Sequence, residues 1–252
     1  MKKILFIIFS FVLIGSSHAG ETFKCSKYVP ENFRLEKPAE CDDTVVWHYD
    51  LPQTADKSSD KSFETRVIDN VMETSNMGGA SFTFPSGVKK NVYRSSFLTG
   101  KEACLSSLIK DAKVGSIINY YYGTLKSADN LSEEERKMFA DLGGKVYIRP
   151  LNYQYKFKKL PKEEIFAKVV EIINLVEHAP GNVIVHCYGG IHRTGVLFGV
   201  MQKCLNKVPV EDVLNEYKCH AAWESEKRPG GADPDNETVI REFPCEKIND
   251  MK

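Results

Sequence analysis

The residues that could do chemistry lie together in one short run of the sequence, 186–194. Cys187 supplies a thiol, whose ionised form is a strong nucleophile, and Arg193 supplies a planar guanidinium that can hold two oxygens of one phosphate. Gly189 and Gly190 lie between them and allow the backbone to curl, so that successive N–H groups point at a single anion. The residue types and their order therefore indicate a loop that binds a phosphate and presents a nucleophile to it.

The neighbouring residues suit the same chemistry. A helix that begins near Arg193 adds the positive end of its dipole to the loop, which favours the thiolate of Cys187. The hydroxyl of Thr194 can hydrogen-bond the sulfur, and we expect His186 to tie the loop to neighbouring backbone. The expected phosphate contacts are a set of loop residues: Tyr188, Gly189, Gly190, Ile191, His192 and Arg193. This chemistry requires no cofactor and no metal, and the adjacent His and Cys residues lack the spacing of a zinc site.

The loop needs a strand before it and a helix after it, and the sequence predicts both. Residues 182–185 form a short apolar run typical of a central parallel strand, and apolar side chains recur at helical spacing after Arg193. Further strands are predicted, with helices between them, at 92–95, 116–119 and 145–148. Ser132 and Glu135 have the spacing of a capping box that opens one of those helices. This alternation predicts an α/β fold, with a mostly parallel central sheet flanked by helices and a ligand site beyond the carboxyl ends of the strands.

The loop also resembles a known signature. His186-Cys187, five further residues and then Arg193-Thr194 resembles the signature of the protein tyrosine phosphatase superfamily. The ending His192-Arg193-Thr194-Gly195 is similar to that of the plant and fungal atypical dual-specificity branch, and the spacing of cysteine, glycine and arginine is shared with the PTP-like phytases. The resemblance implies a fold like the dual-specificity phosphatases and hydrolysis of phosphate monoesters through a phosphocysteine. It also implies four catalytic residues: Cys187, Arg193, Thr194 and His186.

The sequence departs from the family in one respect. The superfamily supplies an aspartic acid, which protonates the leaving oxygen, from a stretch some distance before the cysteine. Here 149–159 contains no carboxylate, and Asn152 stands about where the aspartate is expected. Three explanations stay open: an acid from elsewhere, a proton from a polyphosphorylated substrate or from water, or a weakly active phosphate-binding module. The carboxylates considered as a replacement acid are Asp141, Glu163, Glu224, Asp233 and Asp235.

The same stretch bears on the substrate. Its basic residues alternate with aromatic ones beside the expected pocket, and local positive charge suits a substrate with several phosphates. Candidate substrate-binding residues are Arg94, Asn152, Lys156, Lys158 and Lys159. We therefore expect an inositol polyphosphate as the substrate, with a phosphotyrosine or dual-specificity protein phosphatase as the alternative enzyme. The chain has 34 basic and 34 acidic residues, a balance that argues against a nucleic-acid partner.

Three regions are expected along the chain. Residues 1–19 combine Lys2 and Lys3, a short apolar run and small residues before a cleavage point, which is typical of a signal peptide. Residues 20–86 read as an irregular N-terminal extension, and 87–252 as the phosphatase domain. We expect a periplasmic or secreted protein with no membrane anchor in its mature chain.

The seven cysteines fit an exported protein. An oxidising compartment favours disulfides, and a nucleophilic Cys187 has to stay free, which leaves six cysteines for as many as three bridges. The spacing does not fix how they pair. We expect Cys25–Cys41 and one pair drawn from Cys204, Cys219 and Cys245.

Overall fold

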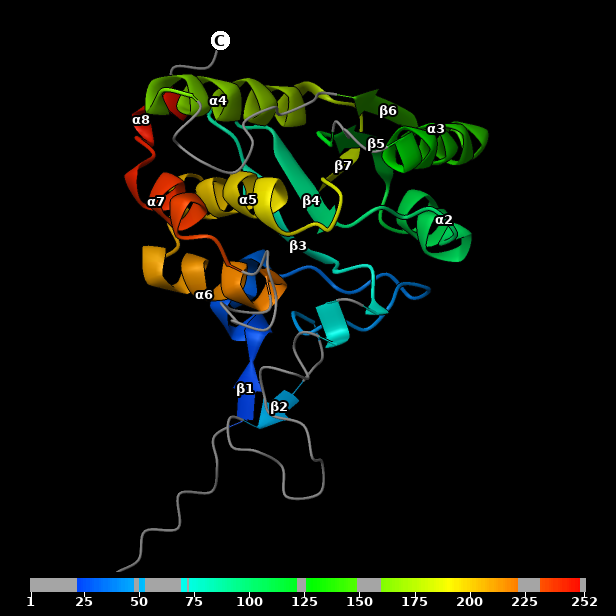
Figure 1. The fold of residues 1–252 in the computed structure, drawn as a ribbon, viewed down its shortest axis with the longest axis horizontal. Helices are drawn as coiled ribbons and strands as arrows, with labels where there is room; N and C mark the ends of the chain where they lie inside the picture. Colours follow the sequence, from blue (N-terminus) through cyan, green and yellow to red (C-terminus); the bar gives the residue numbers. More distant parts are fainter. Residues whose placement is uncertain are drawn as a thin grey trace, which may run out of the picture.

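The computed structural model describes residues 22–47, 50–52, 69–71, 73–121, 126–148, 160–221 and 232–249. At its centre is a five-stranded sheet with the order β3-β4-β7-β5-β6 (Figure 1). Four strands are parallel, and β3 pairs with β4 in the antiparallel direction at one edge. The strands are β3 (Gly78–Thr83), β4 (Lys89–Ser95), β5 (Val114–Asn119), β6 (Lys145–Ile148) and β7 (Asn182–His186). The predicted α/β class, with a mostly parallel sheet, is confirmed.

Helices cover both faces of this sheet (Figure 1). Successive side chains of a strand point to opposite faces, so Val183 and Val185 of β7 pack with α4 and α5, whereas Ile184 packs with α2 and α3. The longer helices are α2 (Glu102–Lys110), α3 (Lys126–Asp141), α4 (Lys162–His178), α5 (His192–Cys204), α6 (Val210–Ala221) and α7 (Pro234–Glu242), followed by the short α8 (Glu246–Asn249). Helices α6 and α7 both contact α5, which places them behind the helix that follows the predicted loop.

The region before β3 consists of short elements. They are β1 (Thr22–Lys24), the 3-10 turns η1 (Cys25–Tyr28) and η2 (Glu31–Phe33), and β2 (Asp50–Pro52), which pairs with β1. The predicted boundary between residues 86 and 87 falls in the turn that joins β3 to β4. These two strands pair from Gly78 opposite Arg94 to Thr83 opposite Lys89, so residues on both sides of that boundary belong to one sheet. The predicted signal peptide, 1–19, lies outside the described residues.

Three disulfides join distant parts of the chain, and Cys187 is free. Cys204 bonds Cys245, so one pair does come from the three cysteines expected to supply it. The predicted Cys25–Cys41 bridge is wrong. The turn η1 packs on α6, where Cys25 bonds Cys219, and Cys41 bonds Cys104 on α2. The spacing in the sequence could not show that these segments fold onto two different helices.

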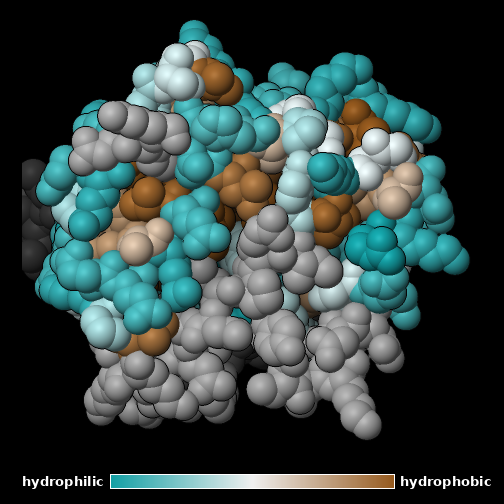
Figure 2. All heavy atoms as spheres, turned by 90° about the horizontal axis from the view of Figure 1, so that it is seen from above, coloured by the Kyte–Doolittle hydropathy of each residue, from teal (hydrophilic) through white to brown (hydrophobic). Residues whose placement is uncertain are grey.

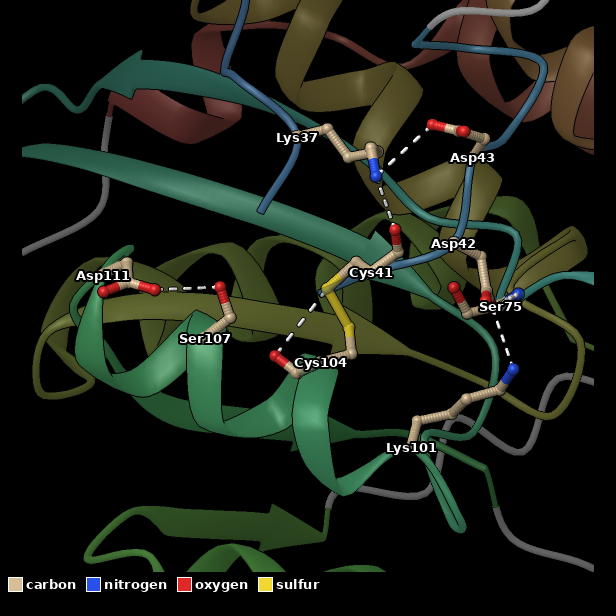
Figure 3. Close-up of a disulfide and its surroundings, with 9 residues drawn as sticks. All are labelled: Lys37, Cys41, Asp42, Asp43, Ser75, Lys101, Cys104, Ser107 and Asp111. Atoms are coloured by element: carbon tan, nitrogen blue, oxygen red, sulfur yellow. Dashed lines mark hydrogen bonds and ion pairs between the residues drawn. A yellow bond between two sulfur atoms is a disulfide. The ribbon is translucent and has the colours of Figure 1, made fainter. Parts of the chain in front are cut away.

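The Cys41–Cys104 bridge lies in a corner that is reinforced by polar contacts (Figure 3). Lys101 forms an ion pair with Asp42 at 3.0 Å, and the same carboxylate accepts a hydrogen bond from the backbone N–H of Ser75 at 3.1 Å. The carbonyl of Ser75 in turn accepts from the backbone N–H of Ser96, at 2.8 Å. This corner therefore fixes the chain just before β3 against the chain just after β4.

The surface is mainly hydrophilic over the described part of the face in Figure 2, with separate hydrophobic patches between the polar residues. Within the described ranges, no helix combines the length and the apolar composition needed to cross a bilayer.

Candidate active site

The predicted loop lies between the end of β7 and the start of α5, at the carboxyl edge of the parallel strands. Cys187 is the first residue after β7 and only 3% of its surface is exposed. The curl of the loop depends on Gly190, which has φ of +66°. A Cβ at this position would lie 2.5 Å from the carbonyl of Ser95, so both the backbone conformation and the close approach require glycine.

The loop carbonyls are held on the outside of the curl. Four consecutive carbonyls, from residue 187 to residue 190, each accept a hydrogen bond from a different part of the chain. The bonds run from His186 Nδ1 to Cys187 O (3.0 Å), Phe97 N to Tyr188 O (3.4 Å), Asn76 Nδ2 to Gly189 O (3.0 Å) and Arg94 Nη2 to Gly190 O (2.9 Å). In a trans peptide the N–H points opposite to the carbonyl, so the N–H groups of residues 188–191 face the other way. They form a cup of donors for one anion.

Contacts on both the backbone and the sulfur of Cys187 favour its thiolate form. Its N–H donates to Thr194 Oγ1 at 2.9 Å, and that hydroxyl donates to Sγ at 3.2 Å. Burial alone would raise the pKa of the thiol, but the hydrogen bonds with Thr194 and the charges of Arg193 and His186 bring the pKa of Cys187 below its usual value. The lowered pKa favours the ionised sulfur, which is the stronger nucleophile.

Arg193 lies in the first turn of α5 and is nearly buried. Its Nη1 donates to the carbonyl of Tyr120 at 3.3 Å, and its guanidinium carbon lies 5.3 Å from the centre of the Tyr121 ring. Both contacts come from the segment that follows β5. The segment after β5 therefore holds the guanidinium of Arg193, which follows the neighbouring strand β7.

His192 is positioned from the side of α6 and α7. Its Nδ1 lies 3.4 Å from the hydroxyl of Tyr217 and 3.2 Å from Nδ2 of Asn236. The same hydroxyl accepts from Asn236 Nδ2 and from the backbone N–H of Asp233, each at 3.1 Å. Tyr217 also fills the space that a side chain at Gly195 would need, since a Cβ there would lie 2.4 Å from its ring. Helices α6 and α7 therefore fix the rim of the loop.

Arg94 lies behind the loop. It is 1% exposed, donates to Gly190 and has its guanidinium carbon 5.3 Å from the centre of the Phe198 ring. Near it, burial raises the pKa of Glu216 to about 7, although the charge of Arg94 and a hydrogen bond from Gln202 oppose the rise. Arg94 was expected as a candidate substrate contact, and these contacts place it instead as a support for the loop.

Three aromatic rings stand beside the nucleophile. Phe97 lies with its ring centre 5.0 Å from that of His186, 5.8 Å from Tyr121 and 6.0 Å from Tyr188. The centres of Tyr121 and Tyr188 are 5.4 Å apart. Tyr188 is 53% exposed, whereas Phe97 and Tyr121 are half-buried. We call these three residues the aromatic wall, and it gives the loop one aromatic side.

The sequence did not indicate the role of two residues that support the site, Glu135 and Asn76. The structure begins α3 at Lys126, so Ser132 and Glu135 lie inside this helix and the predicted capping box is wrong. Both side chains are buried and turn toward Asn119 at the end of β5, whose Nδ2 donates to each at 3.3 Å. Asn76 is the second, and its left-handed φ of 49° leaves no trace in a single sequence. The spacing of Ser132 and Glu135, which matches a capping box, instead places both side chains on the face of α3 that meets Asn119.

Other expected residues do not join the site in the described structure. Asn152, Lys156, Lys158 and Lys159 lie outside the described residues, and so does Glu224. Asp141 is exposed, and Glu163 is exposed and pairs with Lys247 at 3.1 Å. Asp233 caps α7 by accepting from the N–H of Asp235 at 2.9 Å. No group of three metal-ligating side chains occurs in the part of the chain that the structure describes.

Comparison with known proteins adds likenesses of fold. No protein-family model and no curated protein sequence matches this chain. The chain is similar to the core catalytic domain of the PP-IP phosphatase SIW14 from S. cerevisiae in complex with citrate, with a TM-score of 0.45 and 21% identity over 62% of this chain and 83% of that chain. It is similar to P. aeruginosa TpbA, with a TM-score of 0.43 and 14% identity over 63% of this chain and 83% of that one. It is also similar to the kinase associated phosphatase KAP, with a TM-score of 0.40 and 10% identity over 66% and 93%.

Proposed function

We propose that this protein hydrolyses phosphate monoesters through a covalent phosphocysteine on Cys187. One observation carries the proposal. Cys187 is the one free cysteine among the described residues, its pKa is lowered, and it lies in a loop whose four carbonyls are tied outward and whose N–H groups face inward. An anion nest gathered around a nucleophile suits a phosphoryl group better than a carbonyl substrate, because phosphate presents several charged oxygens at once.

The reaction proceeds in two displacements. The thiolate of Cys187 attacks phosphorus, so that a P–S bond forms while the P–O bond to the ester oxygen breaks. The leaving oxygen takes a proton from a neighbouring phosphate of the substrate or from water, and the alcohol departs. Water then attacks phosphorus, the P–S bond breaks, and inorganic phosphate leaves with the thiolate restored. The Thr194 hydroxyl donates to the sulfur as it departs, and Arg193 holds the phosphoryl oxygens whose charge redistributes in both transition states.

For the substrate we favour an inositol polyphosphate. The support comes from the sequence, in which Arg149, Lys156, Lys158 and Lys159 precede the strand that carries the nucleophile. A cluster of cations attracts a ligand with many phosphates far more than one with a single phosphate. Such a substrate also carries ionisable phosphates next to the leaving oxygen, which offer a proton in a chain with Asn152 where an aspartic acid is expected.

The aromatic wall favours a second candidate, a phosphotyrosine phosphatase. An exposed Tyr188 beside Phe97 and Tyr121 provides an aromatic surface next to the nucleophile, against which a phenyl ring can pack. An inositol ring has no aromatic face and gains less from such a surface. The two candidates therefore depend on different parts of the site.

A direct comparison of substrates separates them. Phosphate release is measured from inositol hexakisphosphate and from a phosphotyrosine peptide, with wild type, Tyr188→Ala and Cys187→Ser. The proposal expects a higher kcat/KM on the inositol phosphate, little effect of Tyr188→Ala on that substrate, and no turnover by Cys187→Ser. A preference for the peptide that Tyr188→Ala abolishes would establish the second candidate. Inactivity of wild type on both would leave a phosphate-binding module.

The cellular location is likewise a proposal. Residues 1–19 have the composition of a signal peptide, and three disulfides suit an oxidising compartment. N-terminal sequencing of the protein recovered from the periplasm or the medium is expected to begin at Gly20. Recovery only from the cytosol with Met1 in place would refute it.

A further inference from the structure

Glu135 is a fully buried carboxylate on α3 that does not belong to the loop. Each of its described contacts is with a hydrogen-bond donor. Oε1 accepts from the N–H of Leu98 at 3.3 Å, and Oε2 accepts from Asn119 Nδ2 at 3.3 Å and lies 2.8 Å from His186 Nε2. A carboxylate surrounded by donors needs no proton of its own to satisfy these contacts.

The orientation of Asn119 supports this reading. Its Oδ1 accepts from the backbone N–H of Tyr121 at 2.9 Å, so its NH2 group has to face Ser132 and Glu135. Asn119 therefore donates a hydrogen bond to Glu135. An acceptor at this position would instead require a proton on the carboxyl group.

His186 lies between two acceptors. Its Nδ1 contacts the carbonyl of Cys187 at 3.0 Å and its Nε2 contacts the carboxylate of Glu135 at 2.8 Å. A carbonyl and a carboxylate can only accept, so this position suits a ring that carries a hydrogen on both nitrogens, an imidazolium. Burial alone would lower the pKa of His186, but the charge and hydrogen bond of Glu135 and the contacts with Cys187 raise it overall.

We infer that Glu135 is a positioning residue that keeps His186 doubly protonated, so that the imidazolium holds Cys187 in its thiolate form. The inference deepens the proposed function and rests on it for its catalytic meaning. Glu135 acts through the ring of His186, which contacts both its carboxylate and the carbonyl of Cys187. The geometry of the loop alone would not supply this charge, because burial by itself lowers the pKa of His186 and favours the neutral ring.

The effect is expected to be partial, because other groups act on the same sulfur. Arg193 and the Thr194 hydroxyl face it from α5, and the charge of Arg94 acts on it from β4. For His186, the charged neighbours are Glu135 from α3 and Cys187 itself. Removing Glu135 therefore weakens the stabilisation of the thiolate without abolishing it.

The test uses the rate at which iodoacetamide alkylates Cys187, measured against pH on the oxidised protein. The other six cysteines are in disulfides, so a single thiol is reported. In Glu135→Gln, which keeps the size and loses the charge, the midpoint of the titration is expected to rise by about one pH unit, the lower end of the effect of a nearby opposite charge. Glu134→Gln is the matched control, since Glu134 is exposed on the same helix, and its midpoint should equal that of wild type. An unchanged midpoint in Glu135→Gln would overturn the inference.

A double-mutant cycle shows whether the effect passes through the ring. His186→Asn keeps a donor near the Cys187 carbonyl and removes the imidazolium, so adding Glu135→Gln to it should raise the midpoint no further. A second rise of the same size would mean that Glu135 acts by another route and would overturn the inference. If Glu135→Gln does not fold, nitrogen NMR of wild-type His186 decides: an imidazolium at pH 7.5 supports the inference, and a neutral ring refutes it.

These measurements need no turnover. A wild type that releases no phosphate from any ester would end the proposed function, while the alkylation midpoints would still confirm or refute the link between Glu135 and Cys187.

Discussion

The replacement of Asn76 by alanine tests whether the phosphate loop is held from outside. Asn76 is buried and its side chain makes three hydrogen bonds: Nδ2 donates to the carbonyls of Gly189 and His220, each at 3.0 Å, and Oδ1 accepts from His220 Nδ1 at 2.9 Å. Its partners lie in the loop and at the end of α6. Truncation would leave two carbonyls and one ring nitrogen without these partners in the protein interior.

The size of the loss follows from these contacts. Three buried hydrogen bonds at about 1 kcal/mol each give about 3 kcal/mol, and alanine in a left-handed backbone adds about 1 kcal/mol. For a chain of this size that corresponds to a fall in melting temperature of roughly 10 °C. Because the Gly189 carbonyl loses its anchor, the cup of N–H groups also loosens, and inhibition by inorganic phosphate is expected to weaken by about tenfold, the equivalent of one lost hydrogen bond.

Calorimetry and phosphate inhibition measure the two effects separately. Asn76→Gly is the matched control, since glycine accepts the φ of 49° and removes only the hydrogen bonds. It should fall between wild type and Asn76→Ala in stability and match Asn76→Ala in phosphate affinity. A melting temperature for Asn76→Ala within about 2 °C of wild type, with unchanged phosphate inhibition, would refute the view that the loop is held by this side chain.

Four further predictions concern the site and the fold. Arg193→Lys keeps a charge but loses the planar guanidinium, so kcat/KM should fall by about 10²–10³ in steady-state assays while alkylation of Cys187 changes little. An unchanged kcat/KM would contradict the proposal that Arg193 holds the phosphoryl oxygens. Because the folded pKa of Cys187 lies below its unfolded value, kcat/KM should rise with pH through the folded pKa and level off below the ordinary pKa of a thiol. The contribution of the thiolate to stability should be lost as the pH falls through the folded pKa. A rise of kcat/KM centred on the ordinary thiol pKa would contradict this prediction. Replacing both Cys25 and Cys219 by serine should lower the free energy of unfolding in guanidinium by about 2–5 kcal/mol, since it frees η1 from α6, and an unchanged value would show that packing alone holds them. Asn152→Asp should raise kcat by up to about 10² if this stretch reaches the leaving oxygen, and an unchanged kcat would mean that it does not.

Much of the fold could be predicted from the sequence, because local pattern decides it. The apolar run at 182–185 became β7, and the helix expected near Arg193 begins at His192. The loop residues could be named because a thiol, two glycines and an arginine in this order have few other uses. What could not be predicted depends on which segments meet in space. The pairing of Cys25 with Cys219 is one such case, since the two are 194 residues apart in the sequence.

The supports of the loop were the hardest part to foresee. Asn76 lies before β3, in a region that shows no chemistry of its own, and its role appears only when β3 joins the sheet beside β4. Glu135 lies three residues after Ser132, and this spacing also predicts a capping box at the start of a helix. The tertiary contact with His186 gives the better explanation, because a buried carboxylate needs a partner of opposite charge.

The central claim is tested most directly by trapping the intermediate. Wild-type protein is mixed with a good phosphate ester, quenched in acid within one turnover, digested and examined by mass spectrometry. We expect one phosphoryl group on the peptide that contains Cys187, and none on the same peptide of Cys187→Ser. Rapid turnover in wild type without this adduct, or turnover by Cys187→Ser, would contradict the mechanism.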